Sequence, residues 1–266
     1  MSDPNIRCPS CGHESPAGFR FCGNCGASVS EKPPGLEQAA GARTLYFGAM
    51  QQPNRAKLIL IKGEGLDGVS YLLNADEHLT GRTEGEIRFP DDPYLSPRHA
   101  SFFYHEGALF VRDEDSVNGV FVRIRDAVPI QPGTRLLVGE QLIELGEISA
   151  SEGRQETDGE GTHLYTSPRR PGFFKVIQLL RGGAIGMVFR APTQNVSLGR
   201  EGNDINFPDD PFISGRHASI GVGAGGFTLT DLRSKNGTFV RIDQPYHLHH
   251  GDYVFLGQQL LRVEIT

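Results

Sequence analysis

The sequence lacks the features that mark several classes of protein. Its 266 residues contain no tryptophan, and none of its four cysteines lies beyond residue 25. A secreted disulfide scaffold would spread cysteines through its domains, so this confinement argues against that class. No apolar run approaches the roughly 20 residues of a membrane-spanning helix. The first residues, MSDPNIRCPSCG, have no apolar segment typical of a secretory signal, and we therefore expect a cytoplasmic protein.

An excess of positive charge is also missing. The chain has 26 lysines and arginines against 32 aspartates and glutamates, which gives a formal net charge of −6. Broad binding to a nucleic-acid backbone needs clustered basic residues, so nucleic acid is not an expected partner. The hydrophobic share of 38% and the charged share of 22% are typical of a globular protein, and the length favours two domains.

The cysteines form a pattern of their own in the stretch CPSCGHESPAGFRFCGNCG. Two C-x2-C pairs stand ten residues apart, and each pair lies in a turn that contains glycine. Such a turn directs both sulfurs at one ion, and two turns complete a tetrahedral sulfur shell suited to structural Zn²⁺. A redox pair or two disulfides is the less favoured alternative. The expected metal ligands are Cys8, Cys11, Cys22 and Cys25.

This stretch resembles a short zinc ribbon over residues 6–27. Charges in the first thirty residues sum to zero, so no basic face is visible, and we expect a structural or protein-contact role. Residues 28–55, rich in Ala, Gly, Pro and Gln, are interpreted as a linker.

A long internal repeat organises the rest of the chain. FPDDPYLSPRHAS begins at residue 89 and FPDDPFISGRHAS at residue 207, an offset of 207 − 89 = 118 residues. The same offset pairs other segments without a gap, which indicates tandem domains. We predict one domain at 56–148 and a second at 172–266, joined by a polar linker at 149–171.

Both repeats consist of short apolar runs separated by turn residues. KLILIK, ALFVRD and GVFVRI in the first repeat correspond to FKVIQLL, GFTLTDL and GTFVRI in the second. No long helical period is present, and each repeat has the roughly 100 residues of a two-sheet sandwich. The expected fold class is all-β: two β-sandwiches in tandem and a small zinc ribbon at the amino terminus.

Polar residues kept in both repeats fall at strand ends, where packing of a core explains little. Arginine offers a planar fork of donors suited to phosphate, serine adds a hydroxyl, and Asn-Gly makes a tight turn with a free amide. A Ser-x-x-His spacing lets an imidazole brace the loop that carries the serine. Together these residues favour a receptor for one phosphate on an extended peptide. The two sets are Gly81, Arg82, Ser96, Arg98, His99, Asn118, Gly119 and Gly199, Arg200, Ser214, Arg216, His217, Asn236, Gly237.

In order and spacing, both sets resemble the forkhead-associated (FHA) domain. The resemblance implies apical loops that bind phosphothreonine peptides. It implies phosphate contacts from Arg200 and Ser214, a peptide-backbone contact from Asn236, and loop support from His217 and Gly237. In the first repeat it assigns Arg82, Ser96 and Asn118 to binding and His99 and Gly119 to loop support.

The two copies differ beside the asparagine. The second reads DLRSKNGT, which places Lys235 where the family often has a phosphate-contacting side chain. The first reads DEDSVNGV, with Val117 at that place and Glu114 and Asp115 close by. Phosphothreonine carries about −1.5 to −2 charges at pH 7, so these carboxylates oppose it. We expect the second domain to be the stronger phosphate reader, and the first to be a weak reader or a docking surface for an unphosphorylated partner.

The sequence offers no arrangement typical of a catalytic site, and the protein is expected to be an adaptor and not an enzyme. Its partners would be phosphothreonine-containing proteins, among them a Ser/Thr kinase or its substrates. Thr157 and Thr44 lie in the linkers and, once phosphorylated, could dock on an FHA domain of the same chain. Two alternatives stay open: a zinc-ribbon regulator associated with transcription or nucleic acid, and a scaffold that binds partners without phosphate.

Overall fold

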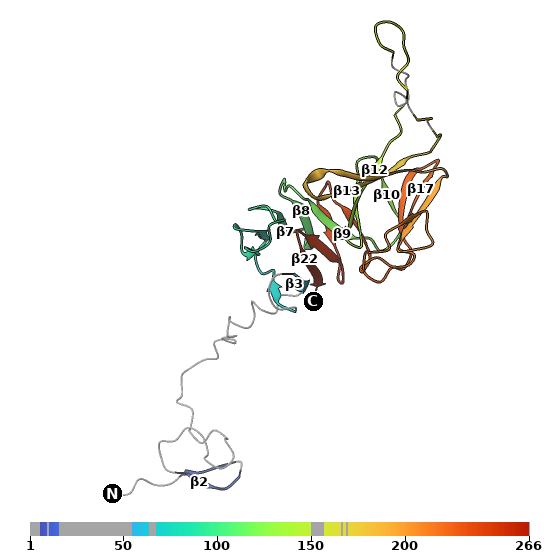
Figure 1. The fold of residues 1–266 in the computed structure, drawn as a ribbon. Coiled ribbons are helices and arrows are strands. Elements are labelled where there is room, and N and C mark those ends of the chain that lie inside the picture. The colour runs from blue at the N-terminus through green and yellow to red at the C-terminus, as the bar shows by residue number, and fades with distance from the viewer. Residues whose placement is uncertain are drawn as a thin grey trace. The chain divides into compact units, whose positions relative to one another are not determined.

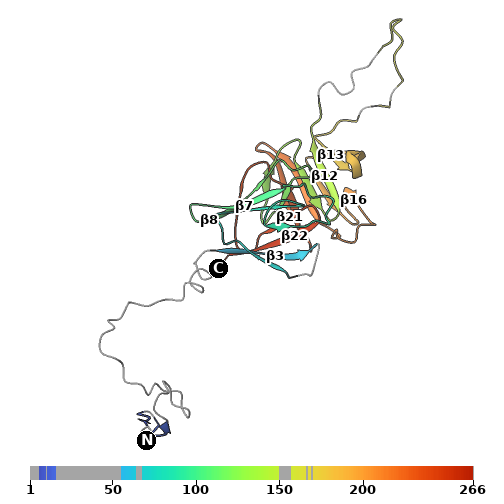
Figure 2. The same cartoon turned by 90° about the vertical axis from the view of Figure 1, so that its left-hand side faces the viewer.

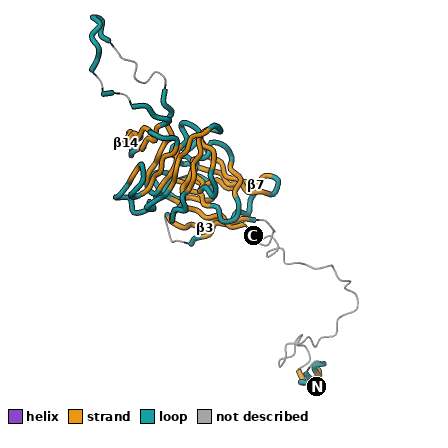
Figure 3. The backbone as a smooth tube through the Cα atoms, turned by 90° about the vertical axis from the view of Figure 1, so that its right-hand side faces the viewer, coloured by secondary structure: helices purple, strands orange, loops and turns teal. Residues whose placement is uncertain are grey.

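The computed structural model describes residues 6–9, 11–15, 55–63, 68–149, 157–165, 167–168 and 170–265. The chain divides into a unit at Met1–Gln51 and a unit at Gln52–Thr266. Strands make up almost all regular structure, and the described part contains a single 3-10 turn, at Arg181–Gly183 (Figure 3). The predicted all-β class is confirmed. Among the residues just named, no helix is long and apolar enough to cross a bilayer.

The larger unit contains two hydrophobic cores, and both repeats contribute to each of them. In the ribbon, the colours of the earlier and later parts of the chain are accordingly mixed within this unit (Figure 1). The first core takes Ala56 to Val122 from the first repeat and Ile242 to Val263 from the second. The second core takes Ile124 to Leu145 and then Phe174 to Leu229. The chain therefore passes from one core to the other in the middle of each repeat.

Each core has its own five-stranded sheet on one side. In both sheets the edge strand comes from the other repeat. In the first sheet the order is β20 (Tyr246–Leu248), β8 (Ala108–Asp113), β7 (Ala100–His105), β5 (Glu77–Gly81) and β6 (Ile87–Arg88). In the second it is β10 (Val128–Ile130), β18 (Gly226–Asp231), β17 (Ala218–Gly223), β15 (Asn195–Gly199) and β16 (Ile205–Asn206).

A continuous ten-stranded sheet forms the other side of both sandwiches. Apolar residues alternate along its strands, as in β3, where Ala56, Leu58 and Leu60 are buried. Figure 2 shows β22 lying between β21 and β3, although β3 is almost 200 residues earlier in the chain. The order is β14 (Ile185–Arg190), β13 (Lys175–Leu179), β12 (Gln141–Gly146), β11 (Arg135–Val138), β19 (Thr238–Arg241), β9 (Val120–Arg123), β21 (Tyr253–Leu256), β22 (Gln259–Ile265), β3 (Ala56–Lys62) and β4 (Ser70–Leu72).

Each repeat contributes strands to the sandwich of the other, and the chain crosses between the sandwiches after β9 and after β19. These strands pair antiparallel, with Val122 opposite Val240. Just beyond them, Ile124 N donates to Thr238 O and Ile242 N donates to Val120 O, both at 2.9 Å. Each repeat thus gives its last strands to the neighbouring sandwich.

This arrangement differs from the expectation that 56–148 and 172–266 each close on themselves. The physical reason is that β10 to β12 of the first repeat are equivalent to β20 to β22 of the second. Either set of three strands therefore fits either sandwich. An exchange of equivalent elements preserves nearly all contacts, and it costs little free energy. Residues 124–127 and 242–245, where a closed repeat would turn back, carry the chain across instead.

A buried aspartate in each repeated PDDP turn holds the hairpin received from the other repeat. Asp92 Oδ2 accepts from Gln258 N at 2.7 Å and from Gln259 Nε2 at 2.8 Å. Asp210 Oδ2 accepts from Glu140 N and Gln141 Nε2, both at 2.8 Å. The opposite oxygen of each aspartate closes the PDDP turn itself, as at Tyr94 N. The repeated phrase therefore joins the two repeats as well as shaping a loop.

Candidate functional site

The predicted binding residues of each repeat come together in loops that precede the crossing point. In the first repeat, Arg82 follows β5, and its backbone N–H donates to Ser96 O at 2.9 Å. In the second repeat, Arg200 follows β15 and makes the same 2.9 Å bond to Ser214 O. Each loop site is thus assembled from one repeat, although each sandwich is built from two.

The glycine before each arginine is required by the close approach of these loops. A Cβ added at Gly81 would lie 2.0 Å from Pro97 O. A Cβ added at Gly199 would lie 2.2 Å from Gly215 O. Any other residue would push the arginine loop away from the serine loop.

The histidines brace the loops from within the core. His99 and His217 are completely buried. Nδ1 of His217 accepts from Ser214 N at 3.0 Å, so Nε2 carries the proton and donates to Gly237 O, also at 3.0 Å. His99 makes the equivalent contacts with Ser96 N and Gly119 O, both at 3.1 Å. Burial lowers the pKa of both rings, which keeps them neutral.

The serine and asparagine side chains connect the loops at the surface. Ser214 Oγ accepts from Lys235 N at 3.0 Å, and Asn236 Nδ2 donates to Phe212 O at 2.7 Å. In the first repeat, Ser96 Oγ accepts from Val117 N, and Asn118 Nδ2 donates to Tyr94 O. Ser96 and Ser214 are half-buried, and Asn118 and Asn236 are exposed.

The turn before each asparagine contains a serine and an aspartate that the sequence analysis did not assign to the site. Ser234 Oγ accepts from Gly237 N at 2.9 Å and donates to Asp231 Oδ2 at 2.6 Å. Thr238 Oγ1 also donates to Asp231. Burial would raise the pKa of this carboxyl, but the hydrogen bonds from Ser234 and Thr238 outweigh it and lower the pKa. The signal was present in the repeat, since Ser116 and Asp113 occupy the same places.

Charge separates the two sites. In the first, Arg98 lies 3.5 Å from Glu114, which Arg112 also contacts at 2.7 Å. Burial would raise the pKa of Glu114, but bonds from Ser101, Arg112 and Arg98 lower it, so the carboxylate stays charged. The second repeat has Leu232 where the first has Glu114, and no carboxylate among the described residues forms an ion pair with Arg216.

The two following positions extend this difference. Asp115 in the first site corresponds to Arg233 in the second, and both adopt the left-handed backbone conformation, with φ of 54° and 61°. Val117, 81% exposed, corresponds to Lys235. In the first site, Arg82 Nε is buried without a hydrogen-bond partner in the part of the chain described, so this N–H can donate to a ligand.

The amino-terminal module is described at its first cysteine turn. β1 (Ile6–Arg7) and β2 (Glu14–Ser15) form a hairpin, inside which Gly12 N donates to Cys8 O at 2.9 Å. Cys8 is buried, and Gly12 has a φ of 73°. This tight turn brings Cys8 and Cys11 to one end of the hairpin, which fits a shared metal ion. Cys22 and Cys25 lie outside the described residues.

Comparison with known proteins identifies the same modules. The FHA-domain family matches residues 78–139 and 196–257, and a zinc-ribbon domain family matches residues 7–29. The chain is 31% identical over 107 residues to the oxoglutarate dehydrogenase inhibitor of Corynebacterium glutamicum, covering 40% of this chain and 75% of that protein. It is 26% identical over 113 residues to the FHA domain-containing protein FhaB of Mycobacterium tuberculosis, covering 41% of this chain and 73% of FhaB.

The comparison with solved structures matches chains from work on phosphothreonine-dependent FHA domain interactions. One such chain is 13% identical, with 80% of this chain and 97% of that chain covered and a TM-score of 0.31. Another is Mycobacterium tuberculosis EmbR in complex with a low-affinity phosphopeptide, at 22% identity, with 42% of this chain and 27% of that chain covered and a TM-score of 0.20.

Proposed function

Because the chain belongs to the FHA-domain family, we propose that it is a non-enzymatic adaptor whose second loop site binds phosphothreonine peptides in Ser/Thr-kinase signalling. The observation that carries this proposal is the positive charge around that site. Arg200 and Ser214 are accompanied by Arg216, Arg233 and Lys235, all three exposed. A doubly charged phosphate is favoured by such a set of donors.

Each residue of the second site has a proposed role. Arg200 and the Ser214 hydroxyl bind the phosphate oxygens, with Arg216 and Lys235 adding charge at the rim. Asn236, which is held by Phe212 O, presents its side-chain oxygen to the peptide backbone. His217 and Gly237 set the loop geometry and do not touch the ligand.

The first loop site is proposed as a weak reader. It has the arginine, serine and asparagine of the second site at Arg82, Ser96 and Asn118, and the same support from His99 and Gly119. Glu114, however, forms an ion pair with Arg98, and Asp115 adds a further negative charge. A phosphate bound there would meet repulsion in addition to the cost of displacing an ion pair.

The proposed partners are proteins that carry a phosphothreonine, such as a kinase or its substrates. The name of the corynebacterial relative, an enzyme inhibitor, supports action through binding to another protein. Thr157 is exposed and pairs with His163 in a short hairpin, and it is a candidate for docking within the chain. Mass spectrometry that finds Thr157 unphosphorylated in cells would remove that candidate, whereas Thr44 lies outside the described residues.

The zinc ribbon is proposed to hold one structural Zn²⁺ through Cys8, Cys11, Cys22 and Cys25. The buried position of Cys8 and the tight turn at Gly12 support this. Metal ligation would supply the folding energy of a module too small to bury a core. A chelator is expected to unfold the ribbon and leave the sandwiches folded, as followed by one-dimensional NMR.

The test uses the full chain, because the second sandwich includes residues from the first repeat. A phosphothreonine peptide library and its unphosphorylated twin are offered to the wild type and to Arg200→Ala, with Arg82→Ala as the matched control. We expect phosphate-dependent binding that falls about a hundredfold in Arg200→Ala, as removal of a bidentate charged donor implies, and changes little in Arg82→Ala. Equal binding of both libraries would instead support the phosphate-independent scaffold.

A further inference from the structure

A pocket of about 460 Å³ lies where the two repeats cross, and it adjoins the second loop site, with which it shares the turn from Asp231 to Ser234. Its walls come from three places in the sequence. Arg123 ends the crossing strand β9 of the first repeat and Arg125 follows it, Asp231 to Ser234 form a turn of the second repeat, and Gly251 to Tyr253 begin the exchanged hairpin. The arginines of the first repeat reach the two segments of the second because the chain crosses from one sandwich to the other here.

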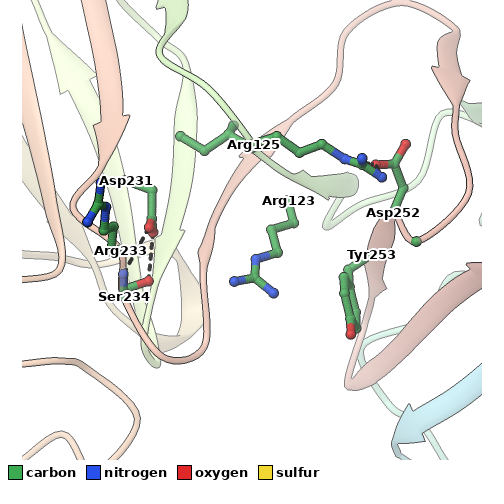
Figure 4. Close-up of a pocket in the computed structure, with 9 residues that line it drawn as sticks. Arg123, Arg125, Asp231, Arg233, Ser234, Asp252 and Tyr253 are labelled. Atoms are coloured by element: carbon green, nitrogen blue, oxygen red, sulfur yellow. Dashed lines mark hydrogen bonds and ion pairs between the residues drawn. The ribbon is translucent and has the colours of Figure 1, made fainter.

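Arg123 occupies the centre of this pocket (Figure 4). Its guanidinium lies 5.4 Å from the centre of the Tyr253 ring, and its Nε lies 2.1 Å from where a Cβ of Gly237 would stand. The ring and the Gly237 backbone therefore hold the side chain from two sides. No carboxylate among the described residues forms an ion pair with Arg123, and its charge remains available to a ligand.

Nearby carboxylates are already engaged. Asp252 is buried and contacts Arg125 at 2.6 Å, and Asp231 accepts from Ser234 and Thr238. Arg233, on the other wall, is exposed and has no ion pair among the residues that the structure describes. Two arginines without an acidic partner thus face one cavity, a combination that favours an anion with several acceptor oxygens.

The equivalent positions on the other side of the crossing point provide an internal control. Arg241 corresponds to Arg123 and packs against Gly119 in the same way, with its Nε 2.3 Å from where a Cβ would stand. Asp115 replaces Arg233, and Asp243 replaces Arg125. The same backbone arrangement is therefore basic on one side and acidic on the other, so the positive pocket is not a necessary product of the fold.

We propose that the pocket around Arg123 and Arg233 is a third anion site, which takes a phosphate group carried by a protein partner. A cavity of this size admits a phosphorylated side chain with part of its backbone. The turn that supplies Arg233 also supplies Lys235 and Asn236 to the second loop site, so a partner with two phosphates can occupy both. Such bivalent binding raises affinity well above that of either site alone.

The test separates this pocket from the loop sites. The full chain carrying Arg82→Ala and Arg200→Ala is titrated with inorganic phosphate at constant ionic strength. The Nε–Hε resonances of its arginines are followed by NMR, with chloride as the control anion. We expect a saturable shift at Arg123 that phosphate alone produces. The further substitution Arg233→Gln should weaken binding about tenfold, the effect of one charge-assisted hydrogen bond.

Asp115→Arg is the reciprocal variant. It places an arginine at the equivalent left-handed position beside Arg241, and we expect phosphate to shift the Arg241 resonance only in this variant. The proposal is overturned if phosphate and chloride act alike at Arg123, if Arg233→Gln binds as tightly as its parent, or if Asp115→Arg leaves Arg241 unresponsive. Because both loop arginines are removed throughout, failure of the pocket and failure of the loop sites remain distinguishable.

Discussion

The two loop sites have nearly the same hydrogen bonds and opposite charge. Both keep the arginine, the serine, the buried histidine and the asparagine, with equivalent bonds that agree within about 0.1 Å. The residues beside the asparagine differ in charge: Glu114 against Leu232, Asp115 against Arg233, and Val117 against Lys235. The comparison shows that loop geometry and affinity for phosphate are set by different residues.

The largest effect is expected from an attempt to separate the two repeats. A specific protease site inserted in the exposed turn at Glu160 and Gly161 allows the linker to be cut after folding. Because each half supplies strands to both cores, we expect the cut chain to elute as one species in size-exclusion chromatography at nanomolar concentration. Tandem domains that each close on themselves would separate under the same conditions.

A control for this cut is refolding. Each half contains a complete set of equivalent strands, so halves that are denatured, separated and refolded alone can close on themselves. We expect these refolded halves to elute as separate species when they are mixed, whereas the halves of the folded, cut chain stay together. Immediate separation of the freshly cut chain would show that the pairing of β9 with β19 and β21 is wrong.

An exchange of charge should convert the first site into a reader. Glu114→Leu, Asp115→Arg and Val117→Lys give it the charges of the second site and release Arg98 from its ion pair. In a background of Arg200→Ala, we expect phosphothreonine-peptide affinity to rise about tenfold or more, as two added charged donors imply. Isothermal titration calorimetry measures the change.

Glu106→Lys is a control for net charge: it adds two positive charges, half of the four that the triple variant adds, at an exposed residue in the turn at the far end of β7. We expect it to leave affinity unchanged. Equal gains in the triple variant and in Glu106→Lys would mean that overall charge, and not local placement, governs binding.

The smallest effect is the pH dependence of the free energy of unfolding, which we expect to be alike for the two sandwiches. Burial lowers the folded-state pKa of His99 and of His217 below the unfolded value of about 6.5. The unfolded chain then binds more protons than the folded one as pH falls below 6.5. The stability that these histidines contribute is complete above that value and is lost as pH decreases toward their lowered pKa values.

Urea unfolding at pH 7.5 and 5.5 measures this dependence. His99→Gln and His217→Gln should each reduce the loss of stability between the two pH values. His105→Gln, at an exposed position, should not. If His99→Gln and His217→Gln leave the loss unchanged, the buried imidazoles are not its source.

Much of the fold could be predicted from the sequence because apolar alternation and turn residues mark the strands. The loop residues were also evident, since Arg200, Ser214 and Asn236 recur at a fixed offset without a packing role. The strand exchange could not be predicted. Leu136 and Val254 occupy equivalent positions in the two repeats, and each is completely buried in the sandwich of the other repeat. A pattern that fits either core says nothing about which core receives it.

The same reason explains why parts of the site were missed. The ion pair between Arg98 and Glu114 depends on side-chain directions across β7 and β8, sixteen residues apart. The bonds that Asp92 accepts from Gln258 and Gln259 cross from one repeat to the other, so the sequence of the turn alone does not predict them. Long-range contacts of this kind leave no local pattern in a single sequence.

The reciprocal exchange has a consequence for how this gene can change. In a chain of independent domains, a copy that no longer recognises phosphate is dispensable and can be deleted. Here the first repeat provides β10 to β12 to the sandwich that carries the second loop site and receives β20 to β22 in return. Selection on the second site therefore preserves the apolar strands of the first repeat while leaving Glu114, Asp115 and Val117 free to drift.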